Sequence, residues 1–152
     1  MREYALIRRI SPPTASKLLS QYYKEGILRR TRYKNYLLFY ANHQSRVFID
    51  LSRMYWRDRL IGLVSALEKK LNNPTIVLFG SLSKGEAKSD SDIDLAIFAQ
   101  KKDFDYLVFE RKIKRKIQVF WFKSVRDVKN VNLLNSFING YLLSGRFSVY
   151  GS

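Results

Sequence analysis

Two short apolar runs near the middle of the chain constrain its fold more than any other feature. Thr75–Phe79 is rich in β-branched residues and stops at Gly80-Ser81, which predicts a strand followed by a glycine turn. After ten further residues, Asp92-Ile93-Asp94 opens a second apolar run that continues to Phe98. Because side chains alternate along a strand, the two aspartates are expected on the same face, about 7 Å apart. The sequence therefore predicts two strands, one ending in a glycine turn and the other beginning with an acidic pair.

This combination indicates a phosphate and metal site. Two carboxylates so close together repel each other, and Mg²⁺ suits the pair because it takes one or two carboxylates, keeps several waters and binds substrate phosphates. Gly80 lets the backbone approach a ligand closely, and Ser81 offers a hydroxyl and an N–H at the start of a following helix. A triphosphate with its metal is expected between the two strands.

The stretch from Thr75 to Phe122 resembles the minimal nucleotidyltransferases of the DNA polymerase beta superfamily. The resemblance rests on the Gly-Ser turn, the ten-residue spacing to Asp-x-Asp, and the segments Lys84-Gly85-Glu86-Ala87 and Ser89–Leu95. It extends less specifically through a helix expected from about Leu133 to Leu143. It implies a mixed sheet flanked by helices, and transfer of a nucleoside monophosphate from a nucleoside triphosphate to a hydroxyl, with release of pyrophosphate.

The resemblance also implies roles for individual residues. The nucleotide-binding residues that it implies are Gly80, Ser81, Lys84 and Ser91. The residues that it implies for catalysis and for binding Mg²⁺ are Asp92 and Asp94. Its third carboxylate would lie on the next core strand, Ile117–Phe122, which contains no acid and has Gln118 at the aligned position. An amide cannot serve as a general base, so catalytic competence is an open question. The other acids considered as a base are Asp90, Asp103, Asp105 and Glu110.

The first third of the chain predicts a second kind of site. The chain carries 28 Lys and Arg against 13 Asp and Glu, a net charge of +15, and residues 1–75 hold +10 of it. A short helix over residues 2–10 precedes Ser11, which is placed to cap a helix starting at Pro12 and ending at Gly26. Two strands follow, 27–30 and 36–40, around a basic turn at 31–35. Helix, turn, helix and basic hairpin together resemble a winged helix-turn-helix.

That resemblance implies binding to double-stranded DNA. In the family the second helix enters the major groove and the hairpin contacts the phosphate backbone. The residues that it assigns to DNA contact are Thr14, Ser16, Lys17, Ser20 and Gln21 on the helix, and Arg29, Arg30, Arg32 and Lys34 on the wing. A solvated basic face on a helical packing module is the alternative. The short first helix and the excess of apolar surface favour a homodimer.

Composition excludes several other classes. No apolar run approaches the roughly 18 residues of a membrane span, and the first residues show no secretion signal, so a cytoplasmic protein is expected. The chain has no cysteine, which excludes disulfides and thiol chemistry, and its single histidine, His43, makes a Ser/His/Asp triad improbable.

The prediction is an α+β chain in two parts. Residues 1–52 form the winged helix-turn-helix, residues 53–152 form the nucleotidyltransferase-like domain, and a helix over 53–72, capped by Asp50 or Ser52, joins them. Three functions remain open: an active nucleotidyltransferase, a DNA-binding regulator with an inactive nucleotidyltransferase-like domain, and a toxin–antitoxin component that adds AMP to a HEPN-type partner.

Overall fold

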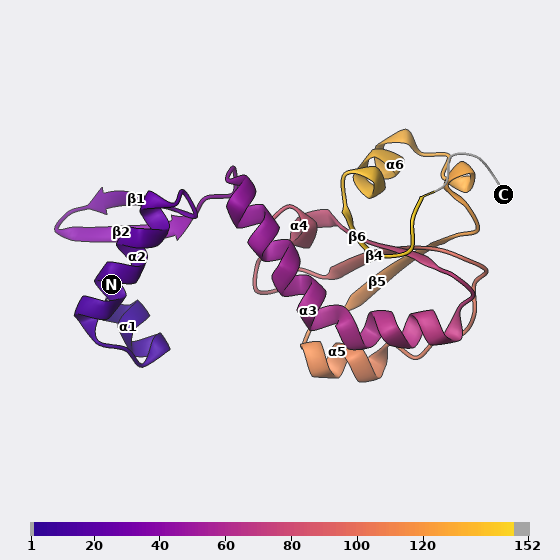
Figure 1. Ribbon diagram of the computed structural model, residues 1–152, viewed down its shortest axis with the longest axis horizontal. Coiled ribbons are helices and arrows are strands. Elements are labelled where there is room, and N and C mark those ends of the chain that lie inside the picture. The colour runs from indigo at the N-terminus through magenta and orange to yellow at the C-terminus, as the bar shows by residue number, and fades with distance from the viewer. Residues whose placement is uncertain (1, 148–152) are drawn as a thin grey trace. The chain divides into compact units, whose positions relative to one another are not determined.

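The computed structural model describes residues 2–147 and divides the chain into two compact units, with the division after Leu51 (Figure 1). The helices are α1 (Arg2–Arg8), α2 (Pro12–Lys24), α3 (Arg46–Lys70), α4 (Gly80–Ser83), α5 (Leu107–Ile113) and α6 (Val131–Ile138), with a 3-10 turn η1 (Val125–Asp127). The strands are β1 (Leu28–Tyr33), β2 (Tyr36–Ala41), β3 (Thr75–Phe79), β4 (Ile93–Phe98), β5 (Ile117–Phe122) and β6 (Tyr141–Ser144). In the described part of the chain, no helix combines the length and the apolar character that crossing a membrane requires.

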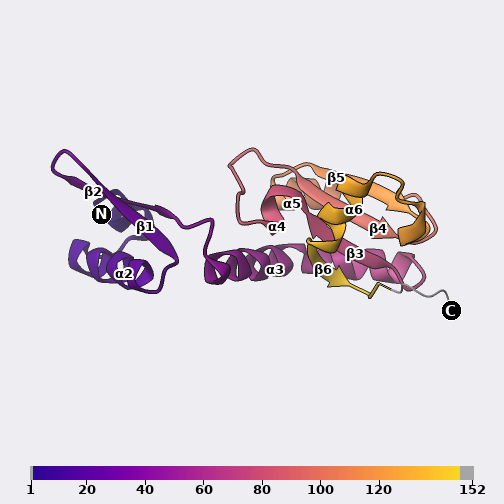
Figure 2. The same ribbon diagram turned by 90° about the horizontal axis from the view of Figure 1, so that it is seen from above.

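The first unit consists of two helices and an antiparallel hairpin whose strand β1 contacts α2 (Figure 2). Ser11 caps α2 as expected, because its Oγ accepts a hydrogen bond from the Thr14 N–H at 3.3 Å. The predicted turn at 31–35 is wrong. Thr31 and Tyr33 continue β1 opposite Leu38 and Tyr36, so only the two residues 34 and 35 form the turn.

The second unit is built on a four-stranded sheet in the order β5-β4-β3-β6. β3 is antiparallel to β4 and to β6, whereas β4 and β5 are parallel, so the sheet is mixed. One face packs on apolar residues of α3 and α5, such as Leu60, Leu67 and Ile113. The other face carries a cluster of aromatic residues around Phe137 of α6. Figure 1 shows α3 and α5 on one side of this sheet and α6 on the other. The expected α+β class, with a mixed sheet flanked by helices, is confirmed.

Two predicted helices differ from the structure. The long helix begins at Arg46 rather than 53, because Ser45 supplies the cap: its Oγ accepts from the Phe48 N–H at 3.4 Å, so Asp50 and Ser52 lie inside α3. The helix expected to reach Leu143 ends at Ile138, and the chain then forms β6 on the edge of β3.

Gly140 explains why that helix stops. A Cβ on this residue would lie 2.7 Å from the Leu78 carbonyl oxygen and 2.7 Å from Val77 Cγ1. Only glycine permits so close an approach to β3, after which the chain pairs with that strand.

Candidate active site

The glycine turn after β3 lies directly against an aspartate of β4. Gly80 has φ +72°, and a Cβ built on it would overlap Asp94 Oδ2 and lie 3.2 Å from Asp94 Cγ. The short helix α4 starts at this glycine, and Ser83 Oγ donates to the Gly80 carbonyl oxygen at 2.9 Å. Register explains the proximity, because Phe79, the last residue of β3, is the antiparallel partner of Asp94. The turn and the acidic strand thus meet at one end of the sheet.

The two aspartates of the Asp-x-Asp motif interact at this end of the sheet. Asp94 is half-buried on β4, and Asp92 is exposed immediately before the strand. Burial raises the pKa of Asp94 above its ordinary value of 3.8, and the negative charge of Asp92 raises it further. Both effects disfavour the ionised carboxylate, and a cation beside the pair would oppose both.

Gln118 lies beside Asp94 on the neighbouring strand. β4 and β5 are parallel, and Asp94 is the register partner of Gln118. Residues in register on adjacent strands share a face, so the amide and the carboxylate point to the same side of the sheet. β5 has no acidic residue, and within residues 2–147 no three His, Cys, Asp or Glu side chains form a group that could hold a metal ion. The oxygen donors gathered here are two carboxylates and one amide.

The loop that leads into the acidic pair is held by an arginine that the sequence did not single out. Arg115 donates from Nη1 to the Ser91 carbonyl oxygen at 2.5 Å and from Nη2 to the Lys88 carbonyl oxygen at 2.9 Å. Its guanidinium also lies over the Trp56 ring, 5.0 Å from the centroid. In the sequence, Arg115 is one residue of a basic run, and nothing distinguishes it from its neighbours.

The remaining residues assigned to the nucleotide have structural contacts of their own. Ser91 Oγ accepts from the Lys88 N–H at 2.9 Å, closing the turn before Asp92. The Ser81 carbonyl oxygen accepts from the Glu86 N–H at 2.9 Å, and the exposed Lys84 is the C-cap of α4.

A second arginine missed by the sequence analysis holds the far end of α4. Arg53 donates from Nε to the Ser83 carbonyl oxygen at 2.8 Å and from Nη2 to the Asn139 carbonyl oxygen at 3.2 Å.

Two of the acids considered as a general base accept hydrogen bonds from backbone N–H groups instead. Glu110 Oε1 accepts from the Ile117 N–H at 2.7 Å, which fixes the start of β5. Asp105 Oδ1 accepts from the Leu107 N–H at 2.9 Å, at the start of α5. Asp103 lines a groove with Lys69 and Lys70, and Asp90 is exposed.

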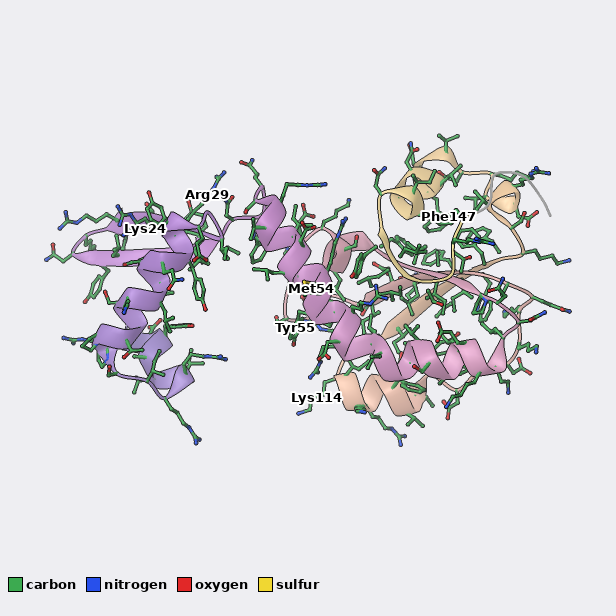
Figure 3. The ribbon with its side chains drawn as sticks, in the orientation of Figure 1. Lys24, Arg29, Met54, Tyr55, Lys114 and Phe147 are labelled. Carbon is green, nitrogen blue, oxygen red and sulfur yellow. The ribbon has the colours of Figure 1, made fainter. Side chains whose placement is uncertain are left out.

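In the first unit, the side chains assigned to the DNA-reading helix are exposed or half-exposed on α2, where Gln21 Nε2 donates to Glu25 Oε1 at 2.8 Å. On the hairpin, Arg29, labelled in Figure 3, donates to Asn42 Oδ1 at 3.0 Å and to Gln44 Oε1. Arg30 lies over the Tyr23 ring at 4.2 Å, and Arg32 and Lys34 are exposed.

The fold and this site define a class: an α+β domain whose mixed sheet carries a glycine turn and an acidic pair at one end. The family model described as "Polymerase beta, Nucleotidyltransferase" matches residues 62–146. The chain therefore belongs to the polymerase beta nucleotidyltransferase family. No curated protein and no solved structure matches the chain. Family membership supports a general function of the nucleotidyltransferase type, with a nucleotide as substrate.

Proposed function

We propose that the second unit binds a nucleoside triphosphate together with Mg²⁺ and transfers the nucleoside monophosphate to a hydroxyl. One observation carries the proposal, the contact of the Gly80 turn with the Asp94 carboxylate inside the segment that matches the nucleotidyltransferase family. This contact brings a turn suited to phosphate oxygens next to an acidic pair. Gly80, Ser81, Lys84 and Ser91 would bind the nucleotide.

The side chains at the site fit one magnesium ion. Asp92 and Asp94 would hold it, since a cation between them offsets both the burial and the repulsion that raise the pKa of Asp94. With the Gln118 amide they offer oxygen ligands, which Mg²⁺ prefers, and waters and phosphate oxygens would complete the coordination. When bound, the ion would neutralise charge on the phosphates and on the leaving pyrophosphate.

The identity of residue 118 affects the rate of transfer. In the reaction, the acceptor oxygen bonds to the α-phosphorus, the bond from that phosphorus to pyrophosphate breaks, and the hydroxyl loses its proton. The side chain in register with Asp94 is an amide, which cannot accept that proton, so the proton passes to water or to the pyrophosphate. Transfer is therefore expected to be slower than with a carboxylate at position 118.

The absence of an acidic side chain at position 118 favours a second candidate function. A site with an acidic pair but no third carboxylate suits a protein that binds a nucleotide and transfers little or nothing. In a DNA-binding regulator of this kind, the bound nucleotide would serve as a signal.

Nucleotide binding and pyrophosphate release, measured separately, test these proposals. Nucleoside triphosphates are titrated into the protein in the presence of Mg²⁺, and binding is measured by calorimetry. Labelled nucleoside triphosphates are then incubated with the protein and hydroxyl acceptors, and the released pyrophosphate is measured. One acceptor is a HEPN-type protein, the AMP acceptor that the resemblance implies. Asp92→Ala with Asp94→Ala should abolish both signals, whereas Asp90→Ala, a nearby exposed carboxylate, should change neither. Nucleotide binding without pyrophosphate release would support the second candidate function, a DNA-binding regulator. Wild-type binding by the double variant refutes the site.

For the first unit we propose binding to double-stranded DNA through α2 and the basic hairpin, supported by the helix–helix–hairpin order and by the exposure of Arg32 and Lys34. Each phosphate contact contributes about 0.9 to the slope of log affinity against log salt, so Arg32→Ala with Lys34→Ala should lower the slope by about 1.8. Lys69→Ala with Lys70→Ala, which removes the same charge from the second unit, should leave the slope unchanged. An equal loss in both variants contradicts contact by the hairpin.

A further inference from the structure

The two faces of the β1–β2 hairpin differ in their surroundings. Register pairs Arg29 with Tyr40, Thr31 with Leu38 and Tyr33 with Tyr36, and opposing residues of a hairpin share a face. The six residues of this outer face are Arg29, Thr31, Tyr33, Tyr36, Leu38 and Tyr40.

The opposite face of the hairpin contacts α2 through β1. Leu28, Leu37 and Phe39 are half-buried there, and Arg30 lies over the ring of Tyr23. The packing of the hairpin therefore uses one face and leaves the other uncovered.

The outer face exposes an unusual amount of aromatic surface. Tyr33, Tyr36 and Tyr40 are 60%, 69% and 49% exposed, and Leu38 is 46% exposed. Single exposed apolar side chains are normal on a protein surface, but four on one face of a two-stranded sheet form a patch that indicates a binding surface.

The charge of the hairpin limits what can cover this patch. No acidic residue occurs between Glu25 and Asp50, and the hairpin carries four cations. The Arg29 guanidinium donates to two neutral amide oxygens, which leave its positive charge unbalanced. Lys34 Nζ lies 5.6 Å from the centroid of the Tyr33 ring. Two positive charges therefore lie next to the aromatic patch. A second copy of the chain would bring like charges together, whereas a polyanion would be attracted.

We propose that this outer face binds single-stranded RNA, with unpaired bases stacked on the tyrosine rings and phosphates beside Arg29 and Lys34. Aromatic rings interleaved with cations are the chemistry that recognises unpaired bases, which duplex DNA keeps stacked inside its helix. The hydroxyls of Thr31 and of the tyrosines lie on the same face, where they can exchange hydrogen bonds with the 2′-hydroxyl that DNA lacks. The proposal is independent of nucleotide transfer. Arg29 and Lys34 also belong to the hairpin proposed to contact duplex DNA, so RNA and duplex DNA would compete for these two cations.

Fluorescence anisotropy on the full chain tests this proposal, with a labelled unstructured RNA of about 12 nucleotides, the same sequence as single-stranded DNA, and its duplex. The RNA should bind most tightly. Changing Tyr33, Tyr36 and Tyr40 together to Ser should weaken RNA binding by about tenfold or more, since stacking is lost. Tyr55→Ser removes a tyrosine that is 55% exposed on α3 and should change nothing.

Replacing the same three tyrosines by Phe separates the two parts of the proposal. The Phe variant keeps the rings, so it should retain binding to single-stranded DNA, while its preference for RNA should fall because only the Thr31 hydroxyl remains on this face. It also controls for folding, because its circular dichroism should match the wild type. Unchanged RNA affinity in the Ser variant, equal affinity of the wild type for RNA and DNA strands, or a dimer in sedimentation that the Ser variant lacks would each overturn the proposal.

Discussion

Replacing Gly80 by alanine tests the geometry on which the proposed active site depends. The residue has φ +72°, a conformation that costs an L-residue about 1–2 kcal/mol. Its Cβ would also overlap Asp94 Oδ2, so the carboxylate must leave its rotamer, at a further cost of about 1 kcal/mol. We expect Gly80→Ala to destabilise the protein by about 2–3 kcal/mol and to weaken binding of Mg²⁺ with nucleotide.

Gly26 provides a matched control for the backbone cost. Its φ is +73°, and a Cβ built on it meets nothing within 4 Å. Gly26→Ala should therefore show only the cost of the left-handed conformation, about 1–2 kcal/mol. The excess for Gly80→Ala measures the overlap with the aspartate.

A double-mutant cycle assigns that excess to Asp94. Asp94→Ala leaves only its own Cβ, 3.4 Å from the position that a Cβ on residue 80 would take, which is an ordinary contact. In this background Gly80→Ala should lose about 1 kcal/mol of its cost. Urea unfolding followed by the fluorescence of Trp56 and Trp121 measures the free energy of unfolding of the second unit. For Gly26→Ala, in the first unit, unfolding is followed by far-UV circular dichroism. Zero coupling between positions 80 and 94 would refute the reasoning.

Three further predictions concern single side chains. Because burial and Asp92 raise the pKa of Asp94, this carboxyl makes the fold less stable as pH rises from 3.8 through the raised value. Asp94→Asn should therefore be more stable than the wild type at neutral pH, with the difference vanishing below pH 3.8 in urea titrations; a constant difference contradicts this. In calorimetry, Arg115→Ala should weaken Mg²⁺-nucleotide binding several-fold more than Lys114→Ala, and Arg115→Lys should restore only part of the lost affinity. Equal effects of the two alanine variants would mean that the arginine does not position the loop. The buried Tyr106 hydroxyl has no hydrogen-bond partner among the described residues, so Tyr106→Phe should keep or raise the thermal midpoint, and a clear fall would reveal a missed partner.

The sequence predicted best where local pattern and packing agree. β3 and β5 have the predicted bounds because both are short runs of strand-forming residues bounded by turns. The register of Asp94 with Gln118 comes from the structure, because the sequence only aligned Gln118 with the third carboxylate that the family resemblance implies. Strand periodicity is a local property and can be counted along the chain.

Features that depend on distant residues were missed. The close approach of Gly140 to β3 sets a helix end that a propensity pattern cannot place. The cap at Ser45 is instead a local contact with the Phe48 N–H, and the sequence analysis placed the cap too late in the chain. Arg115 and Arg53 bind backbone carbonyls of segments remote in sequence, and nothing in the local pattern marks such an arginine.

The pairing of Asp94 with Gln118 has an evolutionary consequence. A glutamine codon becomes a glutamate codon by a single base change, and the two side chains have nearly the same shape. A population of such genes can therefore gain or lose an acid at this position in one step. Comparing residue 118 across related genomes, rather than the aspartates themselves, should separate lineages that transfer nucleotides from those that only bind them.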